Sequence, residues 1–523
     1  MGDLILKGPR SKPTVISLAG AVVTLVPSSF VYDGREHTQG VASVVLNGQT
    51  LTPGTDYTIL NNSATNAGDY RLTIIGIRAY KGAVQVPWSI SKATGSLSVS
   101  PSSLSIQGTG STDTATVTAT GDGALSVTSS NNSVAMASIS GTTVTVEVVG
   151  AGSATVTVTM INGTNYTGAT TSITVEATIA HVYGVSWDGT STTAWSRTDD
   201  AVGFADPVPY VSGATSYSSP FDNLMPWSGI TKVEDSEAGT MVAIPKFWYT
   251  LTQNGAGMKI QIADAELDGF HVSPAHMDRG DGKGERDVVY IGRYHCGASA
   301  YKSASGQKPK VSITRRTART QIHNLGSTIW QVDWAMRFTI GLLYLVEFAN
   351  WNSQDKIGYG CGNIAVQNMG ASDSMPYHTG TMQTSRTTYG VGVQYRNIEG
   401  LWDNCYDWID GCYNNSSGLN LILNPANFSN SSGGVSVGTP SIGYPSAFSV
   451  KNVSGFFPLF LPSATNGSDS TYSCDYWYFY SSYPCVYAGG NYYQSLNYGL
   501  FFWNCTSASS TGGDLGSRSM KLP

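Results

Sequence analysis

The chain has 523 residues and a formal net charge of −6, and only 12% of its residues are charged. A chain of this length exceeds what one hydrophobic core organises, so we expect several domains. The sparse, mildly acidic charge argues against the basic surface of nucleic-acid binders. No run of 18 apolar residues occurs, so we expect no membrane insertion. Residues 1–16 lack the apolar core of a secretory signal, and we interpret them as an attachment segment.

Composition changes sharply along the chain. All seven cysteines lie at or after Cys296, and eleven of the twelve tryptophans follow residue 180. Before that point, Thr- and Val-rich stretches at 115–120 and 153–159 alternate with the period of half-buried strands. Turn residues separate such stretches, as in small β-sandwiches. We therefore predict two all-β domains, at 17–93 and 94–177, followed by a different domain at 178–523.

Turn motifs give these two domains a family resemblance. The first contains YDG (32–34), DYT (56–58), NAG (66–68) and YKG (80–82), and resembles the MBG class of bacterial Ig-like repeats. The second contains SVSPS (98–102), SSNN (129–132), Gly150 and Gly152, and resembles the group 2 bacterial Ig-like domain. Both resemblances imply Ig-like sandwiches that act as spacers or adhesin stalks.

Two helices are predicted in the C-terminal domain. Thr328 and Gln331 have capping-box spacing, and the apolar residues after them recur at helical spacing to about Ala349. These apolar residues are Ile329, Val332, Ala335, Met336, Ile340, Leu343 and Val346. We expect the Trp and Met residues of this helix to lie in the core rather than to form a cofactor site. A second apolar stripe predicts a helix over 399–411. Its other face would carry Glu399, Asp403, Asp407 and Asp410, either as a Ca²⁺ site or as a solvated face favoured by the helix dipole.

Seven short motifs give the rest of the chain a second resemblance. They are IWQVDWAM (329–336), LYLVEF (343–348), NSQ (352–354), GLWDN (400–404), DWIDG (407–411), GG (489–490) and GSR (516–518). In this order they resemble the C-type lectin fold of diversity-generating-retroelement variable proteins, the group that includes phage major tropism determinant. Formylglycine-generating enzymes share that fold. The resemblance implies a multidomain chain in which an α+β C-type lectin domain follows two all-β Ig-like sandwiches.

Residues 472–504 have the composition of an antibody paratope. They contain nine of the chain's 29 tyrosines, where an even spread would place about two, and Asp475 is the only charged residue among them. Tyrosine offers a large contact area with few rotors to fix, while Ser and Asn adapt their hydrogen bonds. The family resemblance implies that this window is the variable region. We predict an exposed ligand-binding face made of Tyr478, Tyr480, Ser481, Ser482, Tyr483, Tyr487, Asn491, Tyr493, Asn497, Tyr498 and Asn504. The alternative is that the window is aromatic core.

Other chemistry is less well supported by the sequence. The seven cysteines match no zinc spacing. His271 and His276 lie near several acids, which indicates either a metal site or a mobile polar loop at 278–284. Five basic residues indicate a solvated strand or an inter-subunit contact: Lys308, Lys310, Arg315, Arg316 and Arg319. We predict no catalytic residue, no metal and no cofactor.

We therefore expect a phage tail receptor-binding protein in the virion, made in the bacterial cytoplasm without a signal peptide. Its partners would be a host cell-surface protein or glycan, other virion tail proteins and, as a homotrimer, its own copies. A bacterial surface adhesin with the same modules is one alternative. A formylglycine-generating-type oxidase is another, because Cys485 and Cys505 lie near Gly489 and Gly490, although the Arg and Ser-Trp of that enzyme motif are missing.

Overall fold

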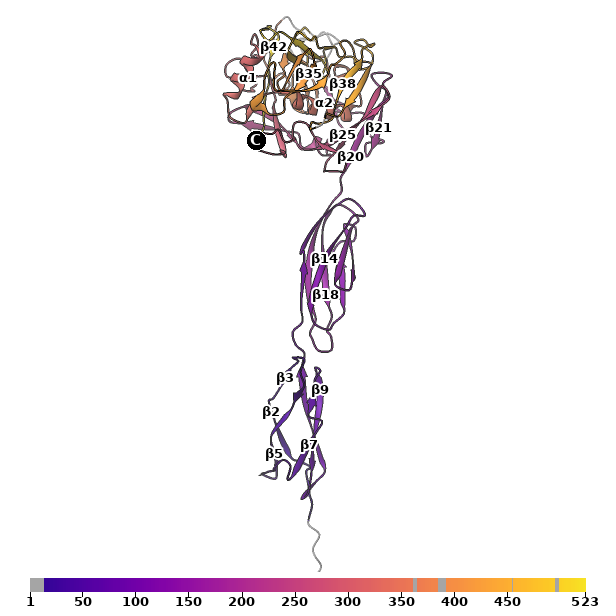
Figure 1. Cartoon of the computed structure of the whole chain (residues 1–523), viewed down its shortest axis with the longest axis vertical. Coiled ribbons are helices and arrows are strands. Elements are labelled where there is room, and N and C mark those ends of the chain that lie inside the picture. The colour runs from indigo at the N-terminus through magenta and orange to yellow at the C-terminus, as the bar shows by residue number, and fades with distance from the viewer. Residues whose placement is uncertain (1–13, 361–364, 384–391, 454, 494–497) are drawn as a thin grey trace, which may run out of the picture. The chain divides into compact units, whose positions relative to one another are not determined.

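The chain is a mostly β, multidomain protein with two compact units, Met1–Ile179 and Ala180–Pro523. A computed structural model describes residues 14–360, 365–383, 392–453, 455–493 and 498–523 (Figure 1). We call the two units the N-terminal unit and the C-terminal unit.

The first half of the N-terminal unit is built from antiparallel and mixed sheets. One sheet has the order β3 (Phe30–Val31), β11 (Ala83–Ser91), β9 (Gly68–Gly76) and β7 (Tyr57–Leu60). A second has the order β2 (Val22–Val26), β5 (Gly40–Leu46) and β6 (Gln49–Thr50). Two short pairs join β1 (Ile16–Ser17) to β10 (Tyr80–Lys81) and β4 (His37–Thr38) to β8 (Ser63–Ala64). Alternate side chains, such as Leu72 and Ile74, meet in a buried core.

The second half of this unit is a sandwich of two four-stranded sheets. One has the order β12 (Ser96–Ser100), β14 (Thr112–Thr120), β17 (Thr143–Val148) and β16 (Ala135–Ser140). The other has the order β13 (Ser103–Gln107), β19 (Ala169–Thr178), β18 (Gly152–Met160) and β15 (Leu125–Ser129). Valines from both sheets, including Val144, Val156 and Val175, are fully buried between them. The alternating stretches seen in the sequence are β14 and β18.

The C-terminal unit contains several sheets around one large core. One five-stranded sheet has the order β21 (Trp195–Asp199), β20 (Val182–Trp187), β26 (Gly257–Ala263), β25 (Trp248–Asn254) and β27 (His271–Val272). A second has the order β23 (Thr231–Asp235), β24 (Gly239–Pro245), β28 (Val288–Gly292), β43 (Ser519–Lys521) and β29 (Ile329–Gln331). A third has the order β39 (Trp477–Tyr478), β41 (Trp503–Thr506), β40 (Cys485–Ala488), β33 (Tyr406–Trp408), β42 (Leu515–Gly516).

Smaller sheets complete this unit. One has the order β22 (Tyr210–Val211), β30 (Gly380–Thr381), β31 (Val393–Tyr395) and β32 (Ile398–Glu399). Another has the order β34 (Cys412–Asn415), β35 (Gly418–Leu421) and β36 (Val435–Gly438). The third pairs β37 (Ala447–Lys451) with β38 (Leu459–Ala464). The helices of the described residues are α1 (Arg315–His323), α2 (Trp334–Phe348), α3 (Ser353–Lys356) and the short 3₁₀ turns η1 (Trp227–Gly229) and η2 (Pro425–Asn427). Among these residues, no helix has the length and apolar character needed to cross a bilayer.

Helix α2 lies at the centre of the C-terminal unit, and every one of its residues is buried. The predicted start of this helix is wrong. Residues Ile329–Gln331 form β29, which pairs with β43, and the N-cap is Asp333, whose side chain accepts a hydrogen bond from the Met336 amide. The Thr328–Gln331 pattern therefore caps no helix. The expected core position of its Trp and Met residues is confirmed for Trp334 and Met336.

The predicted helix over 399–411 is also wrong. Glu399 ends β32, and β33 follows after a turn. Gly400, Asn404 and Gly411 have φ values of +71°, +67° and +64°. Backbone in this left-handed region interrupts a right-handed helix. The apolar stripe of that segment is nevertheless buried, because the turns and short strands pack into the core.

Candidate ligand-binding surface

The sheet β39–β41–β40–β33–β42 carries much of the tyrosine-rich window. Its register places Tyr478 opposite Asn504, and Asn504 opposite Tyr487, so these three residues share one face. Trp477 and Trp503 alternate to the other face, where both rings pack against Trp334 of α2. The window thus contains both core and surface residues, as strand alternation requires.

Three tyrosine rings gather where β39 runs into the following loop. The ring centroids of Tyr478 and Tyr480 are 6.0 Å apart, and so are those of Tyr480 and Tyr483. Tyr480 is 52% exposed and Tyr483 37%, while Ser481 and Ser482 between them are also exposed. We call Tyr478, Tyr480, Ser481, Ser482 and Tyr483, with the half-buried Asn504, the tyrosine patch.

The backbone beneath the patch is held by buried groups. Asn414 of β34 donates from Nδ2 to the carbonyl oxygen of Tyr480 at 2.8 Å. The Cys505 thiol lies 3.2 Å from the carbonyl oxygen of Tyr478, and the Tyr483 amide closes a turn by donating to Tyr480 at 2.9 Å. These hydrogen bonds give the loop a defined conformation.

No charged side chain belongs to the patch. Asp475, the one acid of the window, is buried and accepts hydrogen bonds from the amides of Gly499 and Phe501. Burial raises the pKa of this carboxyl well above its usual range, despite those two bonds and the nearby Arg337. Contacts made by the patch therefore depend on aromatic area, hydroxyls and amides.

The predicted exposure of Asn491 is wrong. Asn491 is only 4% exposed, and its Nδ2 donates to Asp514 at 2.9 Å while its Oδ1 accepts from the Tyr493 amide. This side chain shapes the loop that presents Tyr493, which is itself 61% exposed and contacts the ring of Tyr492. Asn497, also predicted as a contact, lies outside the described residues.

Tyr487 and Tyr498 are half-buried in an aromatic cluster. Their rings pack against Tyr406, at centroid distances of 4.9 and 5.8 Å, and against Phe502. Burial raises the pKa of Tyr487 and of Tyr406 far above the usual value for a phenol. Tyr487 and Tyr498 therefore support the sheet more than they extend the surface.

Asn414, which holds the loop under the patch, was not predicted from the sequence. It has no local sequence signal, because its partners lie more than 60 residues away.

The four acids at 399–410 do not form a solvated face, because each is buried with its own partners. Asp407 lies 3.0 Å from His295 Nδ1 and 3.2 Å from Arg518 Nε. Burial alone would raise the pKa of Asp407, but Arg518 and His295 outweigh it and hold that pKa well below its usual range. Asp403 accepts from the Val393 amide.

Two residues of the predicted basic cluster do not lie on a solvated strand, whereas Lys308 and Arg316 are exposed. Arg315 and Arg319 lie on α1, and Arg319 makes a two-pronged contact with Asp410 at 2.5 and 2.7 Å. Arg315 is fully buried and donates to the carbonyl oxygens of Ile409 and Cys412. Within the described residues, no group of three or more His, Cys, Asp or Glu side chains is placed to hold a metal ion.

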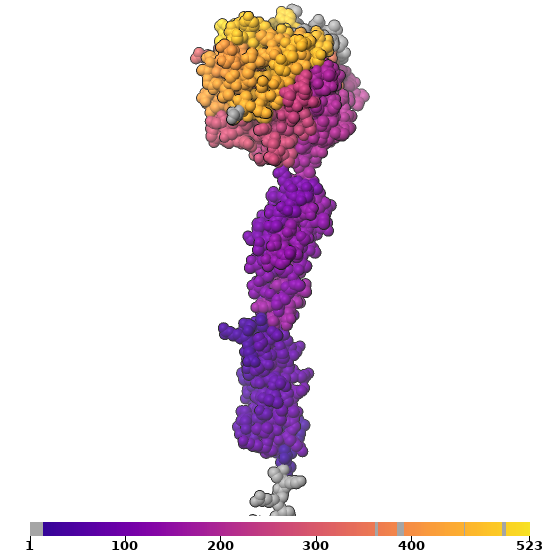
Figure 2. Space-filling view, turned by 45° about the vertical axis from the view of Figure 1, so that its right-hand side comes forward, coloured from indigo at the N-terminus to yellow at the C-terminus, as the bar shows by residue number. Residues whose placement is uncertain are grey.

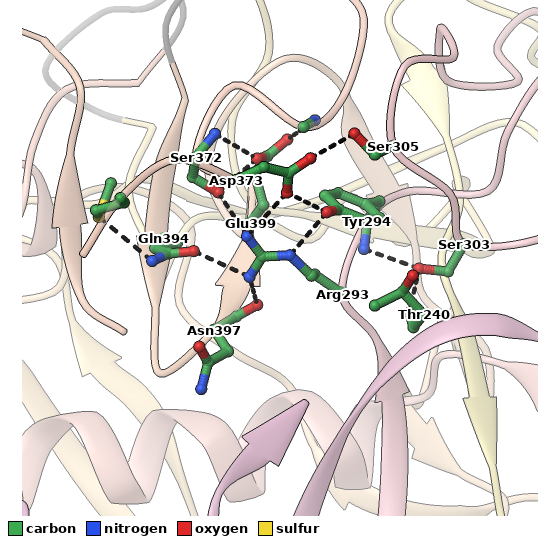
Figure 3. A network of polar contacts seen from close by, with 12 residues as sticks. Thr240, Arg293, Tyr294, Ser303, Ser305, Ser372, Asp373, Gln394, Asn397 and Glu399 are labelled. Atoms are coloured by element: carbon green, nitrogen blue, oxygen red, sulfur yellow. Dashed lines mark hydrogen bonds and ion pairs between the residues drawn. The ribbon is translucent and has the colours of Figure 1, made fainter. Parts of the chain in front are cut away.

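The fourth acid, Glu399, belongs to a polar network around Arg293 (Figure 3). Arg293 donates to the Tyr294 hydroxyl, to Gln394 and to Asp373. Glu399 accepts from the Ser372 hydroxyl at 2.5 Å and from the amides of Ser372 and Gly370. The network fastens the segment around 370–373 to Arg293, which follows β28, and to Glu399 of β32, so its charges are occupied by structural contacts.

The region around His276 is also ordered. The His276 ring lies 2.5 Å from the Ser273 hydroxyl and 2.9 Å from the Ile244 carbonyl oxygen, so both ring nitrogens have protein partners. Burial lowers the pKa of His276 to about 4. In the 278–284 loop, Arg279 is buried and pairs with Asp333 at 2.7 Å. Arg279 therefore anchors this exposed polar loop, and Gly280, Gly282 and Gly284, with φ values of +69°, +79° and +69°, form its turns as expected.

The thiols near the Gly489–Gly490 segment are buried. Burial raises the pKa of Cys485, and it raises that of Cys505 to about 12. A thiol in such surroundings stays protonated near neutral pH, whereas catalytic cysteines act as thiolates.

Comparison with known proteins gives only distant likenesses. No family model matches the chain, and no curated protein matches it. Among solved structures, domains 4 and 5 of the S-layer protein SbsC are 18% identical, covering 30% of this chain and 97% of that one with a TM-score of 0.17. Fibronectin(III)-like modules of Clostridium thermocellum CbhA are 13% identical, with 30% and 95% covered and a TM-score of 0.15. A three-Ig titin fragment is 12% identical, with 52% and 92% covered and a TM-score of 0.17. At such TM-scores these similarities support no conclusion about function.

Proposed function

We propose that this chain is a phage tail receptor-binding protein whose C-terminal unit binds a host surface ligand through the tyrosine patch. One observation carries the proposal. Among the described residues, three tyrosines are more than a third exposed, Tyr480, Tyr483 and Tyr493, and all three belong to the 472–504 window. Elsewhere the described tyrosines are at least half-buried.

The patch has the physical properties of a recognition surface. Tyrosine has an apolar ring and a polar hydroxyl, so it contributes contact area and hydrogen bonds with few rotors to immobilise. The bonds from Asn414 and Cys505 fix the loop in advance. In Figures 1 and 2, the yellow C-terminal segment forms much of the end of the unit away from β20, where the unit begins.

The finer assignment follows from the order of the motifs. We propose that the C-terminal unit is a C-type lectin fold of the retroelement-variable kind, and that the two halves of the N-terminal unit are Ig-like spacers. In a homotrimeric virion component, many weak contacts with a host protein or glycan would add up to firm attachment.

A binding experiment tests the patch. The triple variant Tyr478→Ala, Tyr480→Ala, Tyr483→Ala removes three rings and leaves Trp477 and Trp503 in the core. Fluorescently labelled full chain is applied to the host strain and bound protein is measured by flow cytometry. We expect bound protein to fall about tenfold or more, because truncating an aromatic anchor often costs about 2 kcal/mol of binding free energy.

The matched control removes exposed apolar side chains elsewhere on the same unit: Val202→Ala, Val435→Ala and Ile442→Ala. The control should bind like the parent. Equal binding by both triple variants, with both folded by circular dichroism, would overturn the patch. Sequencing this locus across a phage population tests the variable-region assignment, which predicts changes confined to adenine-containing codons within 472–504.

A further inference from the structure

A second surface feature of the C-terminal unit lies apart from the tyrosine patch. It is an open cleft of about 450 Å³ between β21 with its following loop and the chain that leaves α2. We call it the Trp195 cleft. The residues that matter for its chemistry are Trp195, Arg197, Phe204, Asp206, Asn350 and Lys356. Its volume falls in the range typical of small-molecule sites.

One wall of the cleft is aromatic and rigid. The ring of Trp195 is backed by Trp187, at a centroid distance of 6.1 Å, and by Trp351 at 5.5 Å. Phe204 adds a second ring to the lining. An aromatic wall fixed in this way offers a flat apolar face to a ring-shaped ligand.

The other walls carry oriented charges. The guanidinium of Arg197 donates to the carbonyl oxygens of Val346 and Glu347 at 3.0 and 2.8 Å, which fixes its position at the end of α2. Asp206 is 63% exposed and lies 3.6 Å from Arg197 and 3.1 Å from Lys356. Among the lining residues of the cleft, two cations and one carboxylate leave one positive charge in excess. The lone pairs of Asp206 that face solvent can accept hydrogen bonds from hydroxyl groups.

We propose that the Trp195 cleft binds a sugar ring that carries a carboxylate, that is, a uronic acid unit. The apolar face of the ring packs on Trp195, ring hydroxyls donate to Asp206, and the sugar carboxylate pairs with Lys356. A neutral sugar would form no ion pair with the excess cation, and a simple carboxylate would not pack against the aromatic wall. The ligand class follows from needing both.

The test uses the full chain and saturation-transfer NMR with three probes: methyl β-D-glucuronide, methyl β-D-glucoside and acetate. We expect saturation transfer to the ring protons of the glucuronide, with affinity about fivefold or more above that of the glucoside, as one charge-assisted hydrogen bond would give. We expect no measurable competition by acetate at equal concentration.

Two lysine variants form a matched pair. Lys356→Gln should lower glucuronide affinity to that of the glucoside, while Lys283→Gln, an exposed lysine outside the cleft, should change nothing. Equal binding of glucuronide and glucoside, equal competition by acetate, equal effects of the two variants, or no binding of the glucuronide would each overturn the proposal. The tyrosine triple variant should retain the glucuronide signal, so failure here is separable from failure of the patch.

Discussion

Asp407 is a buried carboxylate with two charged or polar partners. It faces Arg518 and His295, and all three side chains are almost fully buried. We predict that Asp407→Asn destabilises the C-terminal unit by about 3–5 kcal/mol, because it leaves a buried guanidinium without its carboxylate. Urea unfolding followed by tryptophan fluorescence measures this, since eleven of the twelve tryptophans follow residue 180. The exposed Asp268→Asn is the control; a loss no larger than that of the control would contradict the prediction.

Asp222 gives the C-terminal unit a pH dependence at the acid end. Burial alone would raise its pKa, but hydrogen bonds from His378 and Tyr377 and the charge of Arg396 lower it to about 2. The pKa of this carboxyl is lower in the folded state than in the unfolded state, where it is about 3.9. Its stabilising effect on the fold is therefore complete above about pH 4. This stabilisation is lost as the pH falls towards 2.

The Asp222→Asn variant tests this dependence. It should lower the free energy of unfolding at pH 7 by about 1–2 kcal/mol, a figure reduced for partial solvent screening, and flatten the stability curve between pH 4 and 2. The measurement is urea unfolding across that pH range in parent and variant. Parallel curves for the two proteins would show that Asp222 is not responsible.

Sequence reasoning at the residue scale worked for side chains whose role is local. Tyr480 and Tyr483 lie just after a strand. Their exposure could be predicted from the alternation of side chains along that strand and from the Ser481-Ser482 turn between them. It failed for Asn491, because its burial depends on Asp514, a partner in another loop. Composition alone cannot separate an amide that contacts ligand from one that shapes a loop.

At the scale of elements, the start of α2 makes a clear prediction. Asp333 caps the helix through the Met336 amide and also pairs with the buried Arg279. Asp333→Ala should cost about 3 kcal/mol or more, because it removes a cap and leaves a buried charge. Thr328→Ala, at the site the sequence pattern suggested, should cost less than about 0.5 kcal/mol. Chemical denaturation of both variants checks the pair, and similar losses would contradict the assigned cap.

The loop under the tyrosine patch makes a second prediction at this scale. Asn414→Ala removes the donor to the Tyr480 carbonyl. We expect the Tyr483 amide to exchange with deuterium about tenfold faster, as one lost buried hydrogen bond would allow. Hydrogen-exchange mass spectrometry on the full chain measures this. The exposed Asn466→Ala should leave exchange unchanged; unchanged exchange in Asn414→Ala as well would show that the bond does not hold the loop.

The false helix at 399–411 shows why element prediction failed where it did. The apolar stripe was real, since Trp402 and Trp408 are buried. The acids at three- and four-residue spacing imitated a polar helix face, yet His295 and Arg518, which pair with Asp407, lie more than 100 residues away in each direction. Helical spacing does not reveal partners so distant in sequence. The left-handed Gly400 and Asn404 decided the local conformation.

At the scale of the whole molecule, the end of the chain is part of the core. Strand β43 lies between β28 and β29, and Arg518 donates to the carbonyl oxygens of Gly292, Arg293, Glu399 and Gly400. We predict that deleting residues 518–523 unfolds the C-terminal unit and spares the N-terminal unit. Limited proteolysis should then yield a resistant fragment ending near residue 179.

Deletion of Pro523 alone is the control, since this residue is exposed. A truncated chain whose tryptophan fluorescence and protease resistance match the parent would contradict the prediction.

The sequence could place the division of the chain near residue 178, because composition changes there, and the two compact units divide at residue 179. It could not reveal that the last strand completes a sheet, because its pairing partners lie about 190 and 230 residues earlier.

The contacts that hold the patch loop have a consequence for its evolution. Asn414 and Cys505 donate hydrogen bonds to the backbone carbonyl oxygens of Tyr478, Tyr480 and Tyr483, and these bonds do not involve the phenol groups. Every amino acid supplies the same carbonyl, so residues 480–483 can be exchanged for others with little penalty to folding. If the patch binds a ligand as we propose, its specificity can change at these positions while the scaffold stays constant.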